Sequence, residues 1–446
     1  MSATNTTTTT PAPTSPLQLQ TGLEIVAFDS SSQEKQYRVE SPDGRHFQIN
    51  ERFYHLLDLL RTPTTTVDLA VSFHQRTGQQ IPLDQLSALC TQLIEKGLVT
   101  VDGQPTQSTA PAASSTYLGM HFRRTILSAE RLAPLAGLFS GFFRWSVAAP
   151  TIALIVIAHV FAYRELSMQP ELNMAQFAGP LLAFCMLFSI ALHELGHVAA
   201  CQRWNCPHGS LGFGLYFSMP IFYVDVTQAW RLTRRQRAAV DIGGVYIQML
   251  CVPLALLLYW WTGNLTFLML IMAIDVVVIY NFEPWMKMDG YWLLSDLTGV
   301  PNLHNRTRAA TLQIARQLWQ KITLQKPAPQ PSPFAQWPQW VRRVIWGYLA
   351  LSIVIWPLFM IAWLPAMWQA MISYPALVQT ATVDMLMALS QGNLIGAFNQ
   401  LGALFMPTLI VIGLGFELKR LSGPLFAKFI NRRPRFNPNQ PAAVAS

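Results

Sequence analysis

The sequence predicts a polytopic α-helical membrane protein with a small winged-helix-like α/β domain at its N-terminus. Hydrophobic residues make up 51% of the 446 residues and charged residues only 12%, a composition too apolar for an ordinary soluble protein. Six apolar segments are long enough, or nearly so, to cross a hydrocarbon layer of about 30 Å. The formal charge is +8, and the sequence has no block of basic residues interleaved with aromatic residues. The positive charge therefore indicates basic loops on one face of a membrane and not a nucleic-acid partner.

Residues 1–20 are rich in Thr, Pro and Ser, which predicts disorder and shows no signal peptide. Residues 21–103 have the pattern of a small globular domain that stays in the cytosol. Two short strands within 37–49 flank an Asp-Gly turn, and three helical segments follow. The helices are expected at 50–60, 66–76 and 83–96, with Asn50 capping the first, and a last strand at 98–101.

This stretch resembles the PqqD-like domains, which recognise leader peptides of ribosomally made, modified peptides. The resemblance is carried by SPDGRHFQIN, LLDLL and LIEKGLV. In that family a peptide adds as a strand to the sheet edge, so the resemblance implies a peptide partner. A DNA-binding winged helix and a plain regulatory domain stay open. The first is disfavoured by few basic residues and by Asp58, Asp68 and Asp84.

A Pro/Ser/Thr-rich linker at 104–116 leads to the membrane domain, 117–431, and a polar tail at 432–446 is expected to be disordered. The apolar segments run over 147–163, 176–201, 240–261, 265–285, 344–364 and 401–416. With a cytosolic N-terminus and alternating spans, only Arg164 of the 31 Lys and Arg residues falls on the outer side. This asymmetry predicts a multi-pass protein of the inner or cytoplasmic membrane with both termini in the cytosol.

The second apolar segment ends in His193-Glu194-Leu-Gly-His197. Positions i and i+4 share one helix face, so the two imidazoles can bind one zinc ion, while Glu194 can hold and deprotonate a zinc-bound water. A chance match on a buried helix is the alternative. Three ionisable side chains in so apolar a helix are costly, which argues against chance.

A catalytic zinc site usually has a third protein ligand. The fourth segment ends at the same membrane face as the second, where Pro284 breaks the helix and Gly290 permits an unusual backbone. Asp289 is therefore the best candidate for the third ligand, with Asp275 and Glu283 as rivals.

His193-Glu-Leu-Gly-His197 together with Asn281…Pro284…Asp289-Gly290 resembles the site-2 protease family of intramembrane zinc metalloproteases. The stretches YVDVTQAWRLTRRQR and MDGYWLLSDLTGVPNL, with the PqqD-like domain, resemble the peptide zinc metalloproteases of peptide-maturation systems. The resemblance implies that His193, His197 and Asp289 hold Zn²⁺. It also implies that Glu194 is the base and that Asn281 holds substrate backbone or the oxyanion.

The sequence departs from the family pattern at a few positions. Met286 stands where a second Pro is frequent, and Met288 where Leu usually precedes the Asp. In the third segment Gly243-Gly244 replaces a Gly-Pro pair, and Gln248 stands near the position of a common Asn. These changes preserve close helix packing and leave the placing of Asn281 less constrained.

The stretch 211–224 is apolar but interrupted by Gly and Pro, which predicts a re-entrant hairpin. By resemblance it presents a sheet edge to an extended substrate, and a loop that packs over the bundle is the alternative. Asp225 is interpreted as loop structure. Cys201, Cys206 and His208 are interpreted as structural rather than as a second metal site.

The expected activity is zinc-dependent hydrolysis of a peptide bond in a membrane-associated protein or peptide. The expected setting is peptide maturation or export, with maturation enzymes, exporter subunits and membrane lipid as partners. Two other classes stay open. One is a non-proteolytic membrane subunit that binds or exports a modified peptide. The other is a membrane-tethered transcription regulator.

Overall fold

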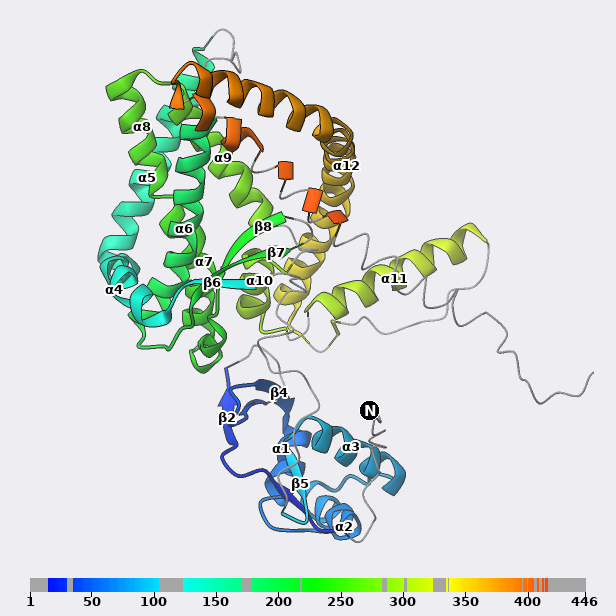
Figure 1. Cartoon of the computed structure of the whole chain (residues 1–446). Helices are drawn as coiled ribbons and strands as arrows, with labels where there is room; N and C mark the ends of the chain where they lie inside the picture. Colours follow the sequence, from blue (N-terminus) through cyan, green and yellow to red (C-terminus); the bar gives the residue numbers. More distant parts are fainter. Residues whose placement is uncertain are drawn as a thin grey trace, which may run out of the picture.

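The computed structural model describes residues 15–29, 35–103, 123–169, 179–216, 219–282, 287–300, 303–323, 334–335 and 337–394, with short stretches between 396 and 415. The predicted linker, the polar tail and Glu283 lie outside the described residues. The chain forms a small N-terminal body below a larger, mostly helical body (Figure 1).

The N-terminal body contains two small antiparallel sheets and three helices. One sheet pairs β1 (Leu17–Leu19) with β5 (Val99–Val101), and the other has the order β2 (Glu24–Phe28), β3 (Gln36–Glu40), β4 (His46–Asn50). The helices are α1 (Glu51–Leu59), α2 (Thr66–Thr77) and α3 (Leu83–Glu95). Asn50 caps α1 by accepting a hydrogen bond from the Phe53 N–H, as predicted. The predicted strands and helices agree with the structure to within one or two residues.

The prediction of disorder for residues 1–20 is wrong at 17–19. Leu17 is fully buried in the N-terminal core, and its N–H donates to the Thr64 carbonyl at 2.9 Å. A three-residue strand has too few positions to show an alternating pattern. Its hydrogen-bond partners are distant in the sequence, so local composition does not reveal it.

The helical body is built around a bundle of apolar helices. The first four are α4 (Ala129–Ser140), α5 (Trp145–Ser167), α6 (Gly179–Arg203) and α7 (Arg234–Gln248), followed by α8 (Cys251–Thr262) and α9 (Thr266–Asn281). Among the described residues, three stretches are long and apolar enough to cross a membrane: α5, α6 and the α7–α8 pair over 234–262. Helix α9 is apolar but has only 16 residues. The bundle encloses a core that includes Val252, Leu268 and Ile271, each fully buried.

The last predicted spans differ from the structure. Helix α12 (Gln339–Ser390) contains the fifth predicted span, 344–364, but continues through Pro365 and Pro375 into the stretch that was expected to connect it to the sixth span. Proline breaks a helix less often in apolar surroundings, because neighbouring groups can satisfy the freed carbonyls. Of the sixth predicted span, 401–416, the structure describes ten residues, all of them helical, in short stretches. Between α9 and α12 the chain forms α10 (Asp289–Thr298) and α11 (Leu303–Ile322).

The stretch predicted as a re-entrant hairpin forms two antiparallel strands, β7 (Leu211–Tyr216) and β8 (Met219–Val224), and its re-entrant placement stays a prediction. A third strand that the sequence did not reveal, β6 (Arg123–Leu127), pairs with β7 and gives the order β6-β7-β8. The chain's own strand thus covers one edge of the hairpin. Among the described residues no strand pairs with the outer edge of β8.

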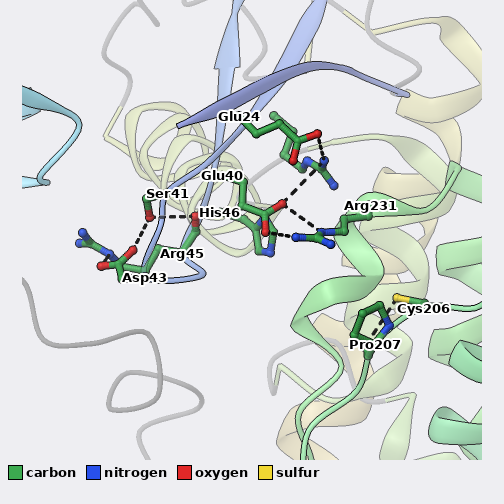
Figure 2. A network of polar contacts seen from close by, with 10 residues as sticks. Glu24, Glu40, Ser41, Asp43, Arg45, His46, Cys206, Pro207 and Arg231 are labelled. Carbon is green, nitrogen blue, oxygen red and sulfur yellow. Dashed lines mark hydrogen bonds and ion pairs between the residues drawn. The ribbon is translucent and has the colours of Figure 1, made fainter. Parts of the chain in front are cut away.

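The N-terminal sheet docks on the short helix η4 (Thr227–Arg231), which precedes α7. Trp230 lies beside Phe28 and His46, with ring centroids 5.8 and 6.2 Å away. Glu40 accepts hydrogen bonds from both Nε and Nη2 of Arg231, and Figure 2 shows this pair bridging the two bodies. Burial raises the pKa of Glu40, but the Arg231 hydrogen bond and nearby positive charges outweigh it and hold the pKa below its usual value. The docking surface therefore includes an ionised, largely buried carboxylate.

Reversing the charges of this pair tests the docking. Glu40→Arg or Arg231→Glu alone should separate the two bodies, because each leaves a buried like-charge pair. The double variant should restore docking. The measurement is the spin-label distance between exposed positions Val71 on α2 and Leu297 on α10. The control is Glu51→Lys, since Glu51 forms only an exposed pair with Lys35. An unchanged distance in both single variants contradicts the described docking.

Candidate metal centre

The structure brings together the three residues predicted as metal ligands. His193 and His197 lie one turn apart near the end of α6 and are 5% and 6% exposed. Their Nε2 atoms are 3.2 Å apart. One oxygen of Asp289 lies 2.7 Å from His193 Nε2, and the other lies 3.5 Å from His197 Nε2. The ligand atoms of these three side chains all lie within 4.8 Å of one another, close enough to hold one metal ion.

Hydrogen bonds on the far side of each ring decide which nitrogen carries the proton. His197 Nδ1 lies 2.8 Å from the Val240 carbonyl, which can only accept, so Nδ1 donates. His193 Nδ1 lies 3.0 Å from Gln248 Oε1. The amide nitrogen of Gln248 donates to Ser189 Oγ, which places the amide oxygen toward His193. Each neutral ring therefore carries its proton on Nδ1 and presents a lone pair on Nε2.

This arrangement fits a cation. Two lone pairs 3.2 Å apart, facing a carboxylate, repel one another unless a positive charge lies between them. Two nitrogens bound tetrahedrally to zinc at about 2.0–2.1 Å lie about 3.3–3.4 Å apart. The observed spacing matches this value, and the two-His, one-carboxylate donor set is common for catalytic zinc. Imidazole Nδ1 atoms that donate to protein acceptors are a regular feature of metal-binding histidines.

Asp289 reaches the histidines because the chain turns sharply between α9 and α10. Helix α9 ends at Asn281, and Asp289 is the first residue of α10. A Cβ on Gly290 would lie 2.6 Å from the Phe282 Cα, so only glycine permits this close return of the backbone. Burial raises the pKa of Asp289, and the two imidazoles outweigh that effect and hold the pKa below its usual range. The carboxylate is thus kept ionised beside the rings.

Three glycines allow α7 to approach the metal-binding face of α6. A Cβ on Gly196 would collide with the Gly243 carbonyl. A Cβ on Gly244 would lie 2.6 Å from His193 Nε2 and closer still to His197 Nε2. The Gly243-Gly244 pair therefore brings α7 against the ligand atoms, with no room for any side chain at Gly244.

The structure also describes Glu194 and Asn281, the predicted base and substrate-binding residue, whose roles stay predictions. Glu194 is half-buried on α6 between the two histidines, and its carboxylate accepts a hydrogen bond from the Val224 N–H at the end of β8. Asn281 is 8% exposed at the last residue of α9. The structure thus joins the HExxH helix to the hairpin through a carboxylate–backbone contact.

The other candidate residues do not join the centre. Asp275 lies 3.1 Å from His159 Nε2 and accepts a hydrogen bond from the Tyr163 hydroxyl at 2.7 Å, so it pairs α9 with α5. Asp225 accepts from the N–H and hydroxyl of Thr227 and so caps a turn. Cys201 and Cys206 belong to no metal-spaced group among the described residues.

Sequence reasoning missed the residues that support the ligands. Ser189, Gln248 and the Val240 carbonyl orient the rings through contacts between α6 and α7. Arg237 on α7 is 1% exposed; its Nε donates to Asp296 on α10 at 2.8 Å, and its Nη2 donates to the Asp29 carbonyl at 3.1 Å. In the sequence, Arg237 is a charged residue just before the apolar segment 240–261. An arginine at a membrane boundary has the same pattern, so the sequence did not reveal its buried ion pair.

Comparison with known proteins gives one distant similarity. Over 116 residues the chain is 27% identical to the Bacillus subtilis (strain 168) protein named "Putative peptide zinc metalloprotease protein YydH". The match covers 26% of this chain and 46% of that protein. No protein-family model and no solved structure match the chain. The similarity supports a zinc-metalloprotease-like family, in agreement with a His-His-Asp group that can hold a metal ion.

Substituting Gly244 tests the packing at the centre. Gly244→Ala should abolish stoichiometric metal binding, because the added methyl group occupies the space beside both Nε2 atoms. The measurement is metal content of the purified protein by mass spectrometry. Gly347→Ala is the control, since nothing lies within 4 Å of a Cβ at that position. Full metal content in Gly244→Ala, with the helical content unchanged, contradicts this geometry.

Removing the acceptor from His193 Nδ1 tests the tautomer assignment. Gln248→Met keeps the side-chain volume but loses the amide oxygen, so metal affinity should fall by about 10–100-fold. Gln248→Glu keeps an acceptor at the same place and should retain more affinity than Gln248→Met. Both affinities are measured by competition with a chromogenic chelator. Equal affinity in the wild type and Gln248→Met shows that the ring is oriented without Gln248.

Proposed function

We propose that the chain is a membrane-embedded zinc metallopeptidase of the site-2 protease type, which hydrolyses peptide bonds of a membrane-associated protein or peptide. The observation that carries the proposal is the convergence of His193, His197 and Asp289, with each imidazole Nδ1 facing an oxygen acceptor. This convergence occurs on a helix apolar enough to span a membrane, next to a glutamate in the HExxH position. The similarity to the Bacillus subtilis protein supports the same class.

The two histidines and Asp289 would hold Zn²⁺, with their supports on α7 keeping the rings aligned. Bound zinc supplies Lewis acidity to the substrate carbonyl and lowers the pKa of a bound water from about 15.7 to roughly 7. Glu194 would take the proton from that water and transfer it to the leaving amine. The Val224 N–H fixes the Glu194 carboxylate for this role. Asn281, on the turn that delivers Asp289, would hold the substrate backbone or the oxyanion.

The outer edge of β8 is suited to hold an extended substrate. β6 covers the opposite side of the sheet, so β8 is the edge left for another strand among the described residues. The Val224 N–H at the end of that edge already reaches Glu194. A peptide added along β8 would therefore pass the metal ligands in extended form, which exposes its carbonyl groups to attack. A helical segment must unwind before it can be cut there.

The N-terminal body is suited to select the substrate. β2 forms one edge of its three-stranded sheet, and among the described residues no strand pairs with the outer side of β2. In this proposal a leader or modified peptide adds to that sheet, as in PqqD-like domains. The chain would lie in the cytoplasmic membrane with both termini in the cytosol and would work beside maturation enzymes or an exporter.

Glu194→Gln tests the catalytic assignment. The variant should keep stoichiometric zinc and lose cleavage by about 10²–10⁴-fold, because general-base assistance is removed. The probe is a defined library of single-span peptides in detergent, with products read by mass spectrometry. Glu165→Gln is the control, since Glu165 lies on α5 and accepts a hydrogen bond from Trp260 instead.

Two outcomes contradict the proposal in different ways. Wild-type cleavage rates in Glu194→Gln show that another group acts as the base. Zinc-loaded wild type that binds library peptides without cleaving any of them supports the alternative, a non-proteolytic peptide-binding or export subunit.

A further inference from the structure

Helix α11 is fixed to the body at its first half. Leu303 and Ala310 are fully buried and belong to one apolar cluster with Tyr291 of α10 and Val341 of α12. The Arg306 guanidinium lies over the Trp337 ring, 4.6 Å from its centroid. These contacts tie the start of α11 to the helix that begins with Asp289.

The second half of α11 exposes an apolar stripe. The exposed fractions are 49% for Leu312, 55% for Leu318, 66% for Trp319 and 75% for Ile322. Leu312, Ala315, Trp319 and Ile322 follow one another at intervals of three and four residues, so they share one helix face, with Leu318 beside them. A contiguous exposed apolar face with polar borders marks an interaction surface.

The charge of α11 is of one sign. The helix contains four cations, Arg306, Arg308, Arg316 and Lys321, and no Asp or Glu. In the part of the chain that the structure describes, Arg308, Arg316 and Lys321 form no ion pair. A partner for this surface must therefore offer both apolar material and negative charge.

The direction of α11 is that of a helix lying along a membrane surface and not of a helix crossing the membrane. In Figure 1 it leaves the body beside α10 and runs across the direction of α5 and α6, at the level of their lower ends. Helices α5 and α6 are two of the stretches apolar enough to cross a membrane. The apolar stripe of α11 thus lies where the apolar part of the bundle ends.

We infer that the second half of α11 lies in the headgroup region of an anionic membrane leaflet. Its apolar stripe enters the acyl boundary while its cations contact lipid phosphates. Trp319 suits this position because its ring is apolar and its N–H is polar. The basic, amphipathic character of the helix is that of an interfacial helix and not of a span. The inference depends on membrane insertion of the bundle and not on peptidase activity.

The experiment compares two neighbouring positions of α11 whose side chains point about 100° apart around the helix axis. Full-length chain without native cysteines carries a spin label at Trp319→Cys or, as the matched control, at Gln320→Cys. Each variant is placed in nanodiscs that contain phosphatidylglycerol or only phosphatidylcholine. Collisions with oxygen report lipid, and collisions with a water-soluble nickel chelate report water. Each variant is used only if its nanodisc sample is monodisperse and its helical content equals that of the wild type.

In phosphatidylglycerol discs the oxygen-to-nickel ratio at position 319 should exceed that at 320 several-fold. In phosphatidylcholine discs, and in a variant with Arg308, Arg316 and Lys321 changed to Gln, the difference should shrink. A water-accessible label at 319 in phosphatidylglycerol discs overturns the inference. Protection from both reagents at 319 also overturns it, because a second copy or another protein then covers the stripe. Neither readout uses cleavage, so failure here leaves the proposed activity untouched.

Discussion

The geometry of the centre depends on where two protons are held. The Val240 carbonyl and the Gln248 amide oxygen each accept a hydrogen bond from an imidazole Nδ1–H, so both Nε2 lone pairs face the same small space. The Asp289 carboxylate faces that space as well. Without a cation these groups repel one another, and with one they supply two nitrogen ligands and one carboxylate. The two acceptors therefore determine a metal site as much as the ligands do.

That arrangement in turn requires α6 and α7 to cross at very close range. Gly196 and Gly243 bring the backbones together, and Gly244 leaves the ligand atoms uncovered. Close helix contact through small residues is a common way to join helices in a membrane, where apolar burial gives no preference for one partner. Here the same contact brings the Val240 carbonyl within 2.8 Å of His197. The close packing of α6 on α7 therefore also determines that His197 carries its proton on Nδ1.

The sequence predicted the parts of this site that follow from local spacing. The i, i+4 spacing places His193 and His197 on one face, and Gly290 marked the close approach of the backbone beside Asp289. Supports that lie on another helix have no such signal. Gln248 is 55 positions from His193 and carries no charge, so its role appears only when α6 and α7 are packed. The strand at 17–19 and strand β6 were missed for the same reason, since their partners lie 80 or more positions away.

The buried side chain of Arg237 contacts both the N-terminal body and α10, the helix that begins with Asp289. Arg237 donates to Asp296 of α10 and to the Asp29 carbonyl, and its guanidinium carbon lies 4.2 Å from the centroid of the Phe28 ring. Undocking would remove the Asp29 acceptor and the ring that covers the guanidinium, and water would then reach the bond to α10. Since α10 begins with Asp289, the docked domain stabilises the helix that supplies the third ligand. The N-terminal body and the metal centre are therefore linked through α7 and α10.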